Sequence, residues 1–117
     1  MTTTTTYQGL QGSTGFPVTL TVTPQDGPKG LAAIDADAHE EAVPVHHTGV
    51  DSGTLKALGE LDRLLEGTGH LMLQAEDARV DIWPKAALAV LGWSDGTRVI
   101  IALATLRAMA AAMGAEG

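Results

Sequence analysis

Hydrophobic and polar residues alternate strictly over residues 16–24, FPVTLTVTP, where Val18, Leu20 and Val22 are interleaved with threonines. A period of two in β-branched residues is typical of a strand that buries one face. Proline cannot donate to a central ladder, so the two flanking prolines limit this segment. The pattern therefore predicts a strand with a buried and a solvent-facing side.

The residues that follow, up to position 49, predict a turn and two further strands. Segment 24–30, PQDGPKG, predicts a tight turn, and segment 30–37, GLAAIDAD, predicts a second strand that forms a hairpin with the first. Segment 42–49, AVPVHHTG, adds a short third strand, which its proline places at a sheet edge.

Residues 50–69 have the clearest helical periodicity. Leucines recur at i, i+3 and i+7 from Leu58, which predicts an amphipathic helix that packs its leucine face on the core. Asp51 or Ser52 is suited to cap its first N–H groups, and Gly67 is suited to end it.

The second half of the chain returns to strands. Residues 70–83 predict a strand, a short turn and a strand, and residues 86–104 predict a hairpin around Asp95-Gly96. The apolar runs of this hairpin barely alternate, which predicts strands that are covered on both faces. Residues 105–114, an Ala-rich segment that ends in glycine, predict a short C-terminal helix.

The order of elements predicts one α+β domain over residues 16–117. We expect a mostly antiparallel sheet of about five to seven short strands, one central amphipathic helix and a short C-terminal helix. Residues 1–15, rich in Thr and Gly, bury little on their own and predict a flexible N-terminal arm. Alternatively, the arm becomes ordered on a neighbouring sheet edge, with Tyr7 and Leu10 as anchors.

Composition excludes several classes of function. The chain of 117 residues carries a formal net charge of −7 and contains no cysteine, which argues against nucleic-acid binding, disulfides and thiolate sites. No signal peptide and no membrane-spanning apolar run is recognisable, so we expect a chain that is cytoplasmic or part of an assembled particle, away from membranes. The absence of asparagine suggests a GC-rich bacterial or phage genome.

Chemical groups are concentrated in residues 35–47, DADAHEEAVPVHH. Carboxylates and imidazoles are metal ligands, and a candidate set consists of Asp35, Asp37, His39 and either His46 or His47. Strand alternation sends His46 and His47 to opposite faces, however, and no ligand motif fixes the spacing of the others. An acidic, solvated connection that a partner protein contacts is the alternative that we favour.

No cofactor motif and no activated nucleophile is recognisable. The glycine-rich segments lack the strand and helix context of a phosphate loop, and no serine lies in a nucleophile elbow. We therefore expect a non-enzymatic protein-protein interaction or assembly module, such as a phage or bacterial particle component, that binds a partner protein or copies of itself. The residues expected to make these contacts are Tyr7, Leu10, Glu40, Glu41 and Trp93. The alternatives are a metal- or small-ligand-binding protein and a small acidic inhibitor that mimics nucleic-acid charge.

Overall fold

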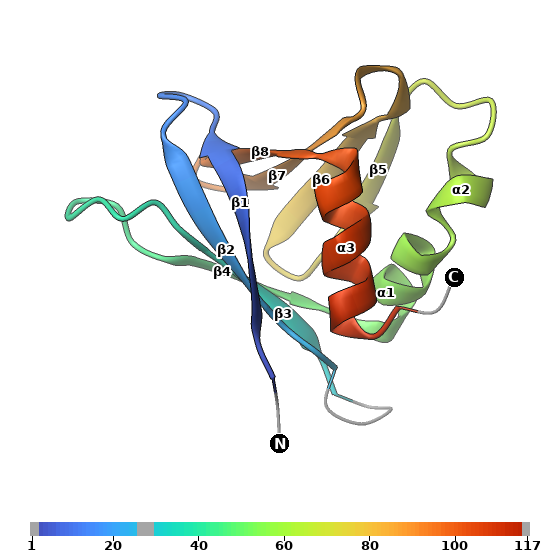
Figure 1. Cartoon of the computed structure of the whole chain (residues 1–117), viewed down its shortest axis with the longest axis horizontal. Coiled ribbons are helices and arrows are strands. Elements are labelled where there is room, and N and C mark those ends of the chain that lie inside the picture. The colour runs from blue at the N-terminus through green and yellow to red at the C-terminus, as the bar shows by residue number, and fades with distance from the viewer. Residues whose placement is uncertain (1–2, 26–29, 116–117) are drawn as a thin grey trace.

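A single antiparallel sheet of eight strands dominates the computed structural model, which describes residues 3–25 and 30–115 (Figure 1). Its strands are β1 (Thr5–Gln11), β2 (Pro17–Thr23), β3 (Ala32–Asp37), β4 (His46–Val50), β5 (Leu71–Gln74), β6 (Ala78–Trp83), β7 (Leu88–Trp93) and β8 (Arg98–Ala102). The spatial order is β4-β3-β2-β1-β8-β7-β6-β5. Two meanders, β1 to β4 and β5 to β8, are thus joined into one curled sheet by the pairing of β1 with β8.

Our fold prediction was wrong in the number of strands and in the helix. The sheet has eight strands where five to seven were expected. The expected helix over 50–69 is two short helices, α1 (Ser52–Gly59) and α2 (Leu61–Leu64), because Glu60 leaves the helical conformation with φ −109° and ψ 21°. A 3₁₀ turn (Pro84–Ala86) and α3 (Leu103–Met113) complete the described helices.

The segment expected to be a flexible arm contains β1. This strand pairs with β2 from Thr5↔Val22 to Leu10↔Pro17, and with β8 through Leu10↔Ile100 and Gln11↔Val99. A threonine-rich segment buries little by itself, but backbone pairing on two sides supplies the order that its composition lacks. Within the segment expected to be a loose arm, residues 5–11 are therefore part of the sheet.

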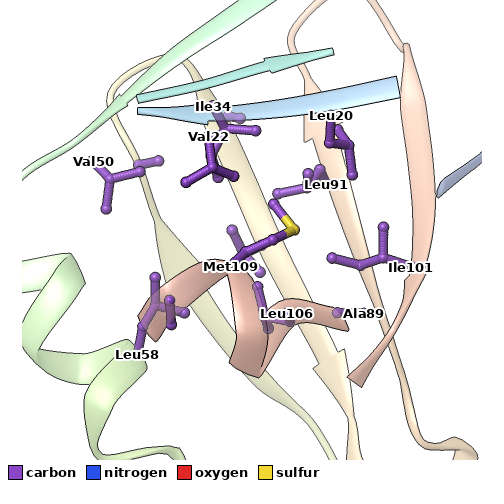
Figure 2. Close-up of a cluster of buried hydrophobic side chains, with 14 of the residues drawn as sticks. Leu20, Val22, Ile34, Val50, Leu58, Ala89, Leu91, Ile101, Leu106 and Met109 are labelled. Carbon is purple, nitrogen blue, oxygen red and sulfur yellow. The ribbon is translucent and has the colours of Figure 1, made fainter. Parts of the chain in front are cut away.

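Helix α3 fills the inside of the curl. It contacts β1 and β2 of one meander, β7 and β8 of the other, and α1 (Figure 1). Figure 2 shows Met109 of this helix pointing between Leu20 of β2 and Leu91 of β7, and all three side chains are fully buried. The core therefore lies between the concave face of the sheet and the helices.

The two ends of the curled sheet meet along a seam beside β4. The N–H of Glu76, in the β5–β6 turn, donates to the Gly49 carbonyl at 3.0 Å, and the N–H of Asp77 donates to Thr48 Oγ1 at 3.0 Å. Trp93 Nε1 donates to the His47 carbonyl at 3.1 Å. We call these contacts the seam; they occupy much of the outer edge of β4.

Several local predictions are confirmed. Asp51 caps α1, since its side chain accepts from the Thr54 N–H at 2.8 Å. Gly96 has a positive φ of 93° in the β7–β8 turn, and Gly114 ends α3 with a φ of 102°. Most of the turn predicted over residues 24–30 lies outside the described residues.

Candidate interaction surface

The outer, convex face of the sheet is divided into a polar half and an apolar half. On β2, β3 and β4, the residues that alternate with the buried ones are mostly polar: Thr19, Thr21, Thr23, Asp35, Asp37 and His47. Such alternation is normal for an antiparallel sheet with one solvated face. Solvent exposure of this half therefore carries no hydrophobic penalty.

On β5 to β8 and the end of β1, the outward positions are mostly apolar. We call this surface the outer apolar face and define it by Leu10, Met72, Trp83, Leu88, Val90 and Ile100. Met72 and Leu10 expose 49% and 48% of their surface, and Trp83 exposes 38%. Among the described residues, no helix covers this side, because all helices that contact the sheet carry core residues on its inside.

The strand register aligns these residues into continuous rows. One row runs across five strands as Met72, Asp81, Val90, Ile100 and Leu10. Directly aligned side chains on one face of a sheet contact one another, so the row forms a continuous band. A shorter apolar row beside it consists of Trp83, Leu88 and Ala102.

Asp81 is the one charged residue in the apolar row, and its charge is satisfied within the chain. Its side chain is only 10% exposed, and its carboxylate lies 2.7 Å from His70 Nε2 and accepts from Arg79 Nε at 2.9 Å. The His70 ring in turn stacks on Trp83, with ring centroids 4.6 Å apart. A carboxylate with two local partners can lose its remaining water without becoming an unpaired buried charge.

A basic row borders the band on its other side. The register aligns Gln74, Arg79, Gly92 and Arg98, so the two arginines flank a glycine. The missing side chain at Gly92 leaves a hollow of about 320 Å³, whose lining also includes Val90. Arg98 forms no ion pair with any residue that the structure describes.

The candidate metal ligands are divided among separate pairs. His47 Nδ1 lies 2.6 Å from Asp35, and His46 Nε2 lies 2.7 Å from Asp95, on the other meander. Asp37 is paired with His39 instead. Within residues 3–25 and 30–115, no group of three or more acidic or histidine side chains converges as a metal site requires.

Asp37, His39 and Thr19 form a hydrogen-bonded chain that resembles the order of a hydrolase triad. His39 Nε2 lies 2.8 Å from Thr19 Oγ1, and its Nδ1 lies 3.4 Å from Asp37 Oδ2. The His39 side chain is, however, 60% exposed on the convex surface. Acyl-transfer chemistry depends on donors that are preorganised in a site from which water is excluded, and this open surface does not support it.

His46 and Asp95 instead join the two meanders at the seam. The His46 ring packs edge-on against Trp93, with centroids 5.3 Å apart. The hydrogen bond from His46, followed by that from the Thr97 N–H, lowers the pKa of Asp95 from 3.8 to about 2. This pair therefore stabilises the ionised carboxylate and has a structural role.

The residues expected to contact a partner lie in different environments. Tyr7 faces the core side, and its hydroxyl donates to the Ala108 carbonyl at 3.2 Å, so it is not an arm anchor. Trp93 is buried at the seam and is not available as a surface anchor. Leu10 is exposed in the outer apolar face, whereas Glu40 and Glu41 lie in the β3–β4 connection.

Sequence reasoning missed Trp83 and Met72. Of the two tryptophans, we expected Trp93 at the contact surface, whereas the strand register shows that Trp83 is the one that faces outward. A related signal was the weak alternation of residues 86–104, from which we predicted strands covered on both faces. In the described part of the chain, helices pack only on the inner face of these strands. The cover that we predicted for their outer face is not supplied by the described residues.

Comparisons with known proteins give no functional assignment. No protein family, curated protein or solved structure matches the chain. In the described part of the chain, no helix has the length and apolar character needed to cross a membrane.

Proposed function

We propose that the chain is a non-enzymatic protein-protein interaction or assembly module and that its contact surface is the outer apolar face. The observation that carries this proposal is the apolar row from Met72 to Leu10, which crosses five strands on the convex side of the sheet. A contiguous exposed apolar surface on a small protein is typical of an interaction site.

The chemistry of this surface favours a protein partner. Exposed Trp83 and Met72 are residue types enriched in protein interfaces. The net charge of −7 repels a phosphate backbone, which argues against a nucleic-acid partner. A component of a phage or bacterial particle fits the proposal, because repeated contacts in a particle cover such faces.

The internal pairing of Asp81 lowers the cost of covering the face. Removing a lone carboxylate from water costs several kcal/mol, which would oppose binding. Here Arg79 and His70 already hold that carboxylate, so a partner meets a surface whose buried charge is satisfied. The face can therefore be desolvated as one unit.

The test replaces two exposed apolar residues with charged ones. We expect the double variant Met72→Glu, Trp83→Arg to keep its fold, because neither side chain belongs to the core and Trp83 loses only its stacking on the His70 ring. We expect it to lose the partner of the wild-type chain in cross-linking followed by mass spectrometry in the native cell. A photo-cross-linking side chain at Leu88 identifies what touches the face.

Thr21→Arg is the matched control, since it places a charge on the polar half of the same convex surface. It should leave every cross-linked partner in place. If the double variant also retains every partner, or if the probe at Leu88 captures no protein, then the outer apolar face is not the contact surface.

A further inference from the structure

We infer that the outer apolar face binds a second copy of this chain and that the β3–β4 loop of one copy contacts the basic row of the other. This inference rests on the proposed function and names its partner. Both contact regions are present on every chain, so no other component is required.

The β3–β4 loop, residues 38–45, is a protruding acidic element. Figure 1 shows this connection extending away from the body of the molecule. It carries Glu40 and Glu41 next to each other, and neither forms an ion pair with a residue that the structure describes. Val45, in the same loop, is 56% exposed and adds an apolar contact.

The loop has a stable shape rather than an open chain of polar residues. The Val43 N–H donates to the Glu40 carbonyl at 3.0 Å and closes a turn. At its start, the His39 backbone N–H donates to Asp37 Oδ1 at 2.8 Å. A preformed loop loses less conformational entropy on binding than a disordered one.

The basic row supplies the complementary charge. Arg98 borders the hollow over Gly92 and has no ion-pair partner among the described residues, whereas Arg79 is shared with Asp81. Asp77 and Asp81 also line this hollow, and because Asp81 is already paired with Arg79, Arg98 is the arginine that remains for a carboxylate of the second copy. Val90 also lines the hollow and offers an apolar contact to Val45 of the loop.

Local complementarity is needed because the whole chains repel each other. Two copies that each carry a net charge of −7 disfavour association at long range. A contact between the acidic loop and the basic row places unlike charges together while the outer apolar face supplies hydrophobic contact. Electrostatic matching of this kind sets the register and partner choice of an interface.

A charge exchange tests the inference. One variant reverses the loop (Glu40→Lys, Glu41→Lys), and the other reverses the row (Arg98→Glu) while Arg79 stays to hold Asp81. We expect wild type to self-associate in analytical ultracentrifugation at low salt and each variant to associate at least about tenfold more weakly, which corresponds to about 1.4 kcal/mol. An equimolar mixture of the two variants should recover association, because the lysines of one meet the glutamate of the other.

Control variants reverse single charges of each sign elsewhere on the surface. Lys56→Glu on α1 and Glu66→Lys after α2 should associate as wild type does, since both side chains are exposed and distant from the sheet face. Circular dichroism establishes that all variants remain folded.

Two results would overturn the inference. The first is a wild type that stays monomeric at every concentration, and the second is a mixture that associates no better than its two components. If the probe at Leu88 then captures a different protein, the proposed function stands and only the self-association fails. If it captures nothing, both fail.

Discussion

At the scale of single residues, Gly9 is the described glycine at which an added Cβ would make the shortest contact. This glycine lies on the inner face of β1, and a Cβ there would be 2.8 Å from Val99 Cγ1 and 2.9 Å from Ile101 Cγ2. Gly9→Ala should therefore lower the free energy of unfolding by about 1–3 kcal/mol through overpacking, measured by urea denaturation. Gly69→Ala, where a Cβ meets nothing within 4 Å, should stay within about 0.5 kcal/mol of wild type. Equal losses at both positions would argue against this packing.

Sequence patterns predicted single residues correctly where one residue determines the local backbone structure. The Asp51 cap and the glycines at 96 and 114 depend on local hydrogen bonds or on positive φ, which neighbouring sequence reveals. Trp83 and Trp93 could not be told apart, because both lie in apolar segments and only strand register decides which one faces out. The pairing of Asp81 with His70, eleven positions away, likewise depends on that register.

At the scale of elements, β1 holds the two meanders in one sheet. It lies between β2 and β8, so its removal leaves the two halves with no strand pairing between them. Deleting residues 2–11 should abolish the cooperative urea transition and the near-ultraviolet circular dichroism, a loss on the order of the whole folding free energy, about 5–15 kcal/mol. Deleting only residues 2–4, which precede the strand, should leave the transition intact. A cooperative midpoint unchanged by the longer deletion would show that β1 is dispensable.

The strands with apolar alternation were predictable, but β1 was not. Residues 18–22 alternate cleanly and form β2, whereas β1 has few apolar residues and is ordered by its two neighbours. The leucine pattern after residue 50 indicated helix correctly but not the break at Glu60, which separates α1 from α2. Burial of leucines from both pieces against the same core explains why one continuous pattern spans two helices.

At the scale of the whole molecule, the contact between His46 of one meander and Asp95 of the other makes stability depend on pH. His46 and the Thr97 N–H lower the pKa of Asp95 to about 2, below the unfolded value of 3.8. The ionised carboxylate therefore stabilises the fold above the unfolded value, and this contribution disappears as the pH falls through about 2. In urea unfolding between pH 2 and 6, Asp95→Asn should be less stable than wild type at the upper end and converge on it at the lower end. Glu66→Gln is the control, and parallel curves for Asp95→Asn would contradict a role for the ionised form.

The pairing of β1 with β8 also determines when the sheet can be completed during synthesis. Leu10 leaves the ribosome 90 residues before its partner Ile100, because the two positions differ by 100 − 10. The first meander can form hairpins before β8 has been synthesised. Its inner face is buried later, because α3, which fills the inside of the curl, follows β8 directly in the chain. Contacts between distant parts of a chain are slow to form, because loop-closure entropy is lost before they stabilise anything. The nascent first meander therefore exposes one edge of β1 and its unburied inner face until β8 and α3 have been synthesised.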